Sequence, residues 1–178
     1  MPEKSSLHVR ATRLVASRPT PVLGAQRPFS TFQSMVAIID SSRFSLLLLV
    51  YALTEPARPL IERIADRASK GVKVTFCLDD HEGNVATLSR LWPANVESPR
   101  VLMPNRKRWA EGNMHAKVII SDTKSALITS ANFTGWATDS NLEVGVLVEE
   151  RLAKELHEYI MALVRSGAIE DRPLVCPR

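Results

Sequence analysis

The sequence of 178 residues has little cysteine and no long apolar segment. Its two cysteines, Cys77 and Cys176, form neither a CxxC motif nor a paired framework, which favours a reducing, cytoplasmic compartment. The apolar stretch FSLLLLVYAL at residues 44–53 is too short to span a bilayer, and its length suits a buried strand. The first residues also lack the apolar core of a secretory signal. These absences argue against a disulfide-stabilised fold and predict no membrane partner.

Excess positive charge is confined to the start of the sequence. The formal net charge is +4, and residues 1–28 hold five basic residues against one acid, so the remainder, with eighteen of each sign, is neutral. We therefore expect a basic N-terminal arm over residues 1–28 and one domain over residues 29–178. The arm is rich in Arg and Ser, as mitochondrial transit peptides are, but Pro19, Pro21 and Pro28 argue against one continuous amphipathic helix. A loosely ordered or docked arm is the simpler interpretation.

Strand-like and helix-like segments alternate beyond the arm, which predicts an α/β fold with a mixed β-sheet flanked by helices on both faces. Apolar residues at helical spacing predict helices over residues 31–41, 58–71, 84–91 and 150–167. Apolar runs predict strands over residues 45–53, 72–78, 101–103, 117–121, 126–129 and 143–148. No second domain and no internal repeat is evident in this pattern.

A histidine and a lysine two residues apart lie at the start of one of these strands, in the stretch GNMHAKVIISD. In an extended chain His115 and Lys117 share one face, roughly 7 Å apart. An imidazole nitrogen can attack phosphorus while an ammonium group offsets charge on the non-bridging oxygens. The pair therefore indicates attack on a phosphodiester, although a lone histidine at such a position is usually structural.

Further polar residues follow at short spacing. Ser130 and Asn132 are again two apart, and their hydroxyl and carboxamide can donate hydrogen bonds to phosphate oxygens. An acid is needed to accept the other ring proton of the histidine and so fix its tautomer. Asp122 and Glu143 are the candidates for this role, and Asp122 is equally well explained as a residue that caps the loop after its strand.

These residues together resemble the phospholipase D superfamily. His115, Lys117 and Asp122 form H-x-K-x4-D, and Ser130 and Asn132 follow where that superfamily has a G-S-x-N element. The segment SNLEVGVLV is similar to the one that carries an acidic residue near the histidine, which is Glu143 here. The upstream segment LTEPARPLIERIADRASKGVKVTFCLD also resembles the family's strand, helix and strand, so the resemblance covers about residues 30–165.

One position departs from the family pattern. Thr129 stands where the family has glycine before the serine. A β-branched residue is not expected in a turn with positive φ, and its side chain narrows backbone access to a phosphate. This departure puts the rate and the fit of the substrate in doubt more than the chemistry.

The resemblance implies a two-histidine mechanism that needs no metal and no other cofactor. One histidine forms a phosphohistidine intermediate, and the other protonates the leaving oxygen and then activates water. This sequence has one H-x-K motif, so the second histidine must come from another copy in a twofold homodimer. Small bacterial endonucleases of the superfamily are similar in length and are built this way. A closer resemblance is to phospholipase D-like proteins encoded beside bacterial antiphage defence systems, the DrmC type.

Two other features have both a functional and a structural interpretation. Arg106, Lys107 and Arg108 precede Trp109, so this loop is a candidate for contacting phosphates and stacking on a base, and equally for a solvated run of charge. Asp79 and Asp80 follow a strand without a further cluster of acids or histidines, which favours a turn over a metal site.

Superfamily members cut phospholipids, transfer phosphatidyl groups or cleave nucleic acids. The single motif, the basic loop with its tryptophan and the positive arm favour a metal-independent phosphodiesterase acting on DNA or RNA. The alternatives are a phospholipase or phosphatidyltransferase of the same superfamily, and a non-catalytic nucleic-acid-binding subunit of a defence complex. Other subunits of such a system are therefore expected partners alongside nucleic acid.

Overall fold

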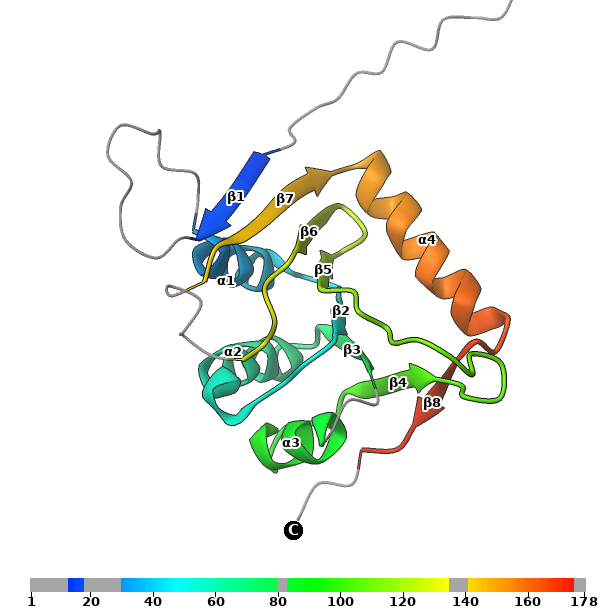
Figure 1. Ribbon diagram of the computed structural model, residues 1–178. Helices are drawn as coiled ribbons and strands as arrows, with labels where there is room; N and C mark the ends of the chain where they lie inside the picture. Colours follow the sequence, from blue (N-terminus) through cyan, green and yellow to red (C-terminus); the bar gives the residue numbers. More distant parts are fainter. Residues whose placement is uncertain (1–12, 18–29, 80–82, 135–140, 175–178) are drawn as a thin grey trace, which may run out of the picture.

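The computed structural model describes residues 13–17, 30–79, 83–134 and 141–174. These residues form one eight-stranded sheet in the order β1-β7-β6-β5-β2-β3-β4-β8 (Figure 1). Its strands are β1 (Arg13–Ser17), β2 (Ser45–Val50), β3 (Lys73–Leu78), β4 (Arg100–Pro104), β5 (Val118–Ser121), β6 (Ser125–Thr129), β7 (Glu143–Glu149) and β8 (Ile169–Arg172). The helices are α1 (Thr31–Ser41), α2 (Arg58–Ser69), α3 (Asn84–Leu91) and α4 (Arg151–Arg165), with a 3-10 turn η1 (Glu55–Ala57).

The sheet is mixed, which confirms the predicted fold class. The β2–β3 and β3–β4 pairs are parallel, and the other neighbouring strands are antiparallel. A parallel pair needs a long crossover connection, and helices α2 and α3 lie in the two crossovers. Antiparallel strands can follow one another through a tight turn, as β5 and β6 do.

Helices cover both faces of the sheet, as Figure 1 shows. One buried cluster contains residues of α1, α2 and α3, and the other contains Ala153 and Ile160 of α4. Strand β5 alternates between them, because Ile119 belongs to the first cluster while Val118 and Ile120 belong to the second. Strand β2 contributes leucines to both clusters, which explains its continuous apolar sequence.

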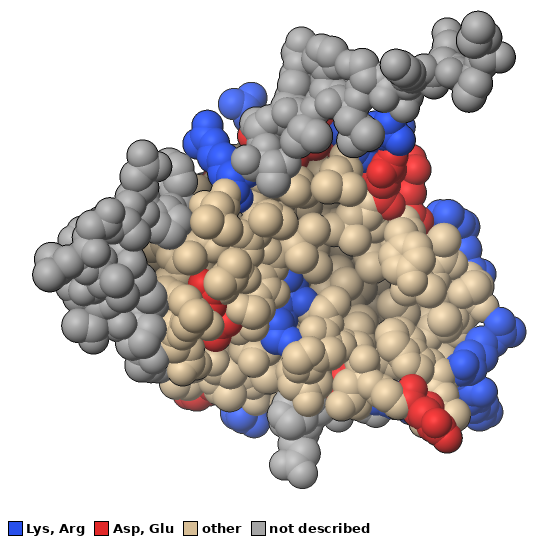
Figure 2. Space-filling view, turned by 45° about the horizontal axis from the view of Figure 1, so that its top comes forward, with Lys and Arg blue, Asp and Glu red and all other residues tan. Residues whose placement is uncertain are grey.

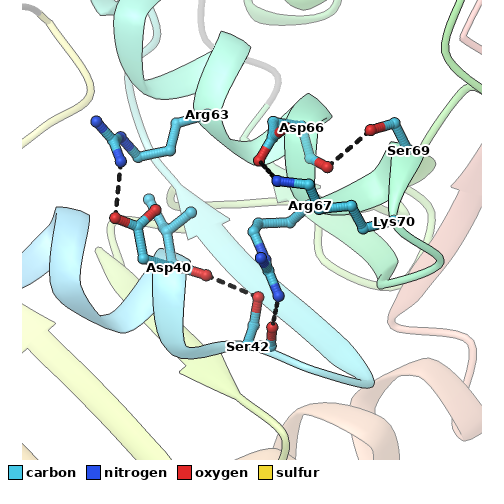
Figure 3. Close-up of polar contacts among 8 residues, drawn as sticks. Asp40, Ser42, Arg63, Asp66, Arg67, Ser69 and Lys70 are labelled. Carbon is cyan, nitrogen blue, oxygen red and sulfur yellow. Dashed lines mark hydrogen bonds and ion pairs between the residues drawn. The ribbon is translucent and has the colours of Figure 1, made fainter.

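Polar contacts join the end of α1 to α2 beside this core (Figure 3). Arg63 donates to Asp40 at 2.7 Å, and the guanidinium of Arg67 donates to the carbonyl oxygen of Ser42. The Ser42 hydroxyl is buried and donates to the carbonyl oxygen of Ile39 at 2.7 Å. Exposed ion pairs contribute little stability, whereas a hydrogen bond to the last carbonyl groups of a helix satisfies acceptors that have no helical partner. These contacts define where α1 ends and β2 begins.

Both edge strands, β1 and β8, were missing from the sequence prediction. Strand β1 lies within the predicted arm, and its residues pair with β7 so that Val15 faces Gly145. Val15 is 1% exposed, so this part of the arm is built into the sheet. Residues 1–12 and 18–28 lie outside the described ranges, so the division into an arm and a domain stays a prediction.

Candidate active site

The strand order explains why the residues of the candidate site meet. β5 runs antiparallel to both β2 and β6, and β7 runs antiparallel to β6. The beginning of β5, the end of β2, the end of β6 and the beginning of β7 therefore lie at one edge of the sheet. His115 and Lys117 lead into β5, Ser130 follows β6, and Glu143 begins β7.

The histidine and the lysine are in direct contact. Nζ of Lys117 lies 3.2 Å from Nδ1 and 3.2 Å from Nε2 of His115, and it donates to the carbonyl oxygen of His115 at 3.0 Å. His115 is exposed, whereas Lys117 is 6% exposed. The regular strand begins only at Val118, but the prediction that the two side chains lie side by side is confirmed. An imidazole open to solvent thus lies against a shielded ammonium group.

Burial changes the proton affinity of the lysine. Loss of hydration lowers the pKa of Lys117, and the negative charge of Glu143 partly opposes that effect. A cation in a shielded position interacts more strongly with a nearby anion than the same cation in water. Lys117 is therefore well placed to offset charge that develops on a bound phosphate.

Ser130 and Glu143 form a second pair at this edge. The Ser130 hydroxyl donates to the Glu143 carboxylate and accepts from the backbone N–H of Val144 at 3.1 Å. Among the described residues, the ring nitrogens of His115 make no hydrogen bond to a carboxylate, so Glu143 acts on the serine and the lysine rather than on the histidine. No contact between described residues supports the predicted role of Glu143 in fixing the tautomer of His115.

Asn132 lies just beyond Ser130. Its carboxamide oxygen is buried and has no hydrogen-bond partner among the described residues. An unsatisfied buried acceptor carries a cost and is uncommon in folded proteins. The amide nitrogen remains the group by which Asn132 would donate to a phosphate oxygen, and that role stays a prediction.

Asp122 lies at the opposite end of β5 from His115. Its carboxylate accepts from the backbone N–H groups of Arg43, Phe44 and Ser45 at 2.9, 2.7 and 2.8 Å. Partial burial alone would raise the pKa of Asp122, but these three donors and the charge of Lys124 together lower it. Asp122 cannot orient the histidine from this position. Its role is structural, but it anchors the connection from α1 to β2 rather than capping the loop after its own strand.

Replacing Asp122 with alanine should lower the free energy of unfolding by about 2 kcal/mol, because three amide donors lose a charged acceptor. The pKa of Asp122 is lowered on folding, so its contribution is complete above about pH 4, the ordinary aspartate value, and is lost as the pH falls through the lower folded value. Urea unfolding of both proteins should show the gap narrowing below that pH. Asp66→Ala, which removes only an exposed pair with Lys70, should cost less than about 1 kcal/mol. Equal losses for the two variants would contradict this role.

Thr129, which replaces the family's glycine, causes no backbone strain. Its φ is not positive, and its hydroxyl accepts from the N–H of Ala131 at 3.1 Å. The residue opposite Thr129 across the β6–β7 ladder is Gly145. A Cβ added at Gly145 would lie 2.6 Å from the carbonyl oxygen of Ile128 and 3.0 Å from Cβ of Thr129. Because Gly145 has no side chain, it leaves space for the side chain of Thr129 on the neighbouring strand.

Replacing Gly145 with alanine should destabilise the protein by about 1–3 kcal/mol, because the new methyl group meets the backbone of β6. Chemical denaturation provides the measurement. Val144→Ala, which changes a neighbouring side chain that is 49% exposed, is the matched control and should cost much less. An unchanged midpoint for Gly145→Ala would mean that β6 and β7 separate readily.

The basic loop ahead of His115 makes several contacts within the fold. Arg106 donates to the carbonyl oxygen of Gly112 at 2.7 Å and lies 4.0 Å from the buried carboxylate of Asp79. Arg108 donates to the carbonyl oxygen of Ser166 at the end of α4. Trp109 is partly buried against the cluster on the α4 face. These contacts give the three residues a structural role, and their predicted role in binding substrate stays a prediction.

The Lys107 side chain is exposed and makes no hydrogen bond or ion pair with another described residue. On the face shown in Figure 2, a basic group lies in a central hollow of largely uncharged surface, and other basic groups stand at the margins. The described part of this face thus carries separate charges rather than a continuous basic surface.

Tyr51 is a site residue that the sequence prediction missed. Its ring centroid lies 4.2 Å from that of His115 at an interplanar angle of 63°, and Nζ of Lys117 lies 4.8 Å from the Tyr51 centroid. The available signal was its position as the first aromatic residue after the apolar run of β2. Trp136 follows the Ser130 and Asn132 segment in the sequence, where it is either a pocket wall or a core residue, and it lies outside the described residues.

Neither metal ligands nor membrane spans are found in the described part of the chain. No group of three or more His, Cys, Asp or Glu is placed to hold a metal ion in residues 13–17, 30–79, 83–134 and 141–174. Over the same ranges, the helices are too short or too polar to cross a bilayer. Asp79 uses a carboxylate oxygen to accept from the N–H of Met114 at 2.6 Å.

The mixed sheet and the H-x-K pair at the ends of its strands agree with the expected phospholipase D-like domain. The sequence profile described as "Cardiolipin synthase, PLD-like domain" matches residues 35–164, which is most of the chain. The chain belongs to this family of phospholipase D-like domains.

Known proteins show the same relationship. The DISARM protein DrmC of Bacillus paralicheniformis is 25% identical over 133 residues, which is 75% of this chain and 55% of DrmC. The chain thus spans about half the length of this curated relative. The phospholipase D family member Nuc of Salmonella typhimurium has a similar fold, with a TM-score of 0.68, 21% identity, and coverage of 91% of this chain and 97% of Nuc.

Two further solved structures share the fold. NucT of Helicobacter pylori matches with a TM-score of 0.64 and 22% identity over 79% of this chain and 90% of NucT. Phosphatidylserine synthase of Haemophilus influenzae matches with a TM-score of 0.61 and 15% identity over 82% of this chain but 37% of the synthase.

Proposed function

We propose that this protein is a metal-independent phosphodiesterase that cleaves nucleic acid through a phosphohistidine intermediate and acts as a homodimer. The observation that carries the proposal is the contact between the exposed imidazole of His115 and the buried ammonium of Lys117. Attack on a phosphodiester needs a nucleophile and a fixed positive charge at the same phosphate. This pair supplies both.

The proposed reaction has two steps. A ring nitrogen of His115 forms a bond to phosphorus, and the bond from phosphorus to the leaving oxygen breaks while that oxygen takes a proton from the imidazolium of a second His115. Water then attacks phosphorus, the phosphorus–nitrogen bond breaks, and the proton of the water returns to the second imidazole. One product ends in a phosphate and the other in a hydroxyl group.

The second histidine comes from another copy of the chain. His157 is the other histidine in the described residues, and it lines a cavity of about 190 Å³ together with Ser45 and Thr123. Those two residues lie near the ends of β2 and β5 that are remote from His115. Burial lowers the pKa of His157, which disfavours the protonated form that an acid catalyst needs. A twofold dimer supplies an identical His115 instead.

The single motif supports nucleic acid as the substrate. The fold aligns with nearly all of Nuc, whereas it corresponds to about a third of the phosphatidylserine synthase. One H-x-K motif in this domain fits the resemblance to the small endonucleases of the superfamily. The relationship to DrmC further suggests that the protein works with other subunits of an antiphage defence system.

A lipid substrate is the second candidate, because the matching family is described by a cardiolipin synthase and one similar fold is a phosphatidylserine synthase.

Labelled DNA and RNA, single- and double-stranded, and phospholipid vesicles should each be incubated with the protein in EDTA. We expect cleavage of an oligonucleotide, and light scattering on the same sample should give the mass of a dimer. Turnover of vesicles alone would overturn the substrate, and an active monomer would overturn the composite site. Salt-sensitive binding that survives His115→Ala, with no turnover by the unmutated protein, would identify a binding subunit.

A further inference from the structure

The ring of Tyr51 contacts both members of the proposed catalytic pair. Its centroid is 4.2 Å from that of His115 at 63°, and 4.8 Å from Nζ of Lys117. The two rings are thus in close contact with their planes inclined, and an ammonium group over a phenol ring is attracted by its electron-rich face. Tyr51 thus touches a nucleophile on one side and a cation on the other.

A buried hydrogen-bond network fixes the backbone of Tyr51. Asn84 is 2% exposed, and its carboxamide donates to the carbonyl oxygen of Tyr51 at 2.8 Å and accepts from the N–H of Leu53 at 2.9 Å. The same carboxamide donates to the carbonyl oxygen of Asp79 at 3.0 Å. The Asp79 side chain in turn accepts from the N–H of Met114, which immediately precedes His115. Asp79, after β3, and Asn84, at the start of α3, therefore hold both segments that meet at the site.

His115 needs such support because it is exposed and lies before the regular part of β5. An exposed imidazole with no lateral contact exchanges between rotamers, and a lysine has four rotatable side-chain bonds of its own. A ring that is carried on a held backbone and contacts both groups restricts both at once. Misplacement of a reacting group by about 1 Å can cost roughly a hundredfold in rate.

We propose that Tyr51 is a positioning residue whose ring holds the His115 imidazole and the Lys117 ammonium in the orientation needed for attack on phosphorus. Asn84 and Asp79 hold the backbone segments that carry this contact. The kinetic part rests on the proposed function. The ring contact itself does not depend on the substrate.

The contact can be tested without any activity, because the chain has two tyrosines, Tyr51 and Tyr159. Protein labelled with 3-fluorotyrosine should give two fluorine resonances, assigned with Tyr159→Phe. We expect His115→Ala and Lys117→Met each to shift the Tyr51 resonance and to leave that of Tyr159, which is 62% exposed on α4, in place. An unmoved Tyr51 resonance in both variants would overturn the contact.

Kinetics separate positioning by the ring from a chemical role of the hydroxyl. Tyr51→Leu should lower kcat by about 10- to 100-fold with little change in KM, while Tyr51→Phe, which retains the ring, should stay close to the unmutated protein. Tyr159→Leu is the matched control and should leave both constants unchanged. Thermal unfolding verifies that each variant is folded, and the fluorine resonances keep the inference testable if Tyr51→Leu does not fold.

The outcomes distinguish this inference from the proposed function. An unchanged kcat for Tyr51→Leu, or a loss in Tyr51→Phe as large as in Tyr51→Leu, would overturn positioning by the ring. Turnover of vesicles instead of oligonucleotide would revise the substrate, and the same variants would then be compared on vesicles. If the unmutated protein turns over neither, the proposed function fails while the fluorine resonances still decide whether the contact exists.

Discussion

Replacing His115 with alanine should lower the rate of oligonucleotide cleavage in EDTA by on the order of 10⁴-fold, because the variant has no group to form the bond to phosphorus. Because His115 of one copy is the proposed nucleophile and His115 of the other copy is the proposed acid, the substitution removes both groups from the composite site. The side chain is exposed, so the free energy of unfolding should be nearly unchanged. A labelled oligonucleotide resolved on a denaturing gel gives the rate.

The control for this prediction is His157→Ala on α4, which removes a histidine from the far side of the fold. It should retain the cleavage rate of the unmutated protein. Substantial cleavage by His115→Ala, or an equal loss in the two variants, would show that the reaction does not depend on His115.

Replacing Lys117 with methionine should lower kcat by about 10²- to 10³-fold, the effect typical of removing one group that stabilises charge in a transition state. Methionine fills similar space at a position that is 6% exposed, so the fold should be retained. Lys124→Met, at an exposed lysine after β5, is the matched control and should stay active. A loss confined to KM would show instead that Lys117 only binds the substrate.

The alkaline side of the pH profile tests the same lysine. Burial lowers the pKa of Lys117, and the charged form is the one that stabilises phosphate. Activity should therefore fall as the pH rises through this lowered value, beginning below about 10.4, where an ordinary lysine loses its proton. The Lys117→Met variant should lack this alkaline decline in its residual activity.

Most of the fold was predictable because its elements satisfy local rules. The apolar run of β2 is buried on both sides, and Pro59 and Gly71 delimit α2 as expected of these residue types. The edge strands were not predictable in this way. Strand β8 has the sequence IEDR, and its pairing with β4 is accompanied by an ion pair between Arg100 and Asp171 that no local pattern reveals.

The site was predictable where neighbours in sequence are neighbours in space. His115 and Lys117 are two residues apart and touch, whereas the contact of Tyr51 with them exists only because β2 and β5 are antiparallel partners. The basic loop shows the opposite limit, because charge in the sequence did not reveal that Arg106 and Arg108 bind backbone carbonyl groups. Charge patterns predict where a cation lies, and only tertiary structure shows what it holds.

Direct capture of the covalent intermediate tests the central claim. Protein in EDTA should be mixed with an oligonucleotide labelled with phosphorus-32 at the scissile phosphate, and stopped in denaturing alkali, in which phosphohistidine survives. We expect label on the peptide that contains His115, rising before product and then decaying into it, and none in His115→Ala. Complete single-turnover cleavage with no label on the protein at any time, or label on another residue, would contradict the mechanism.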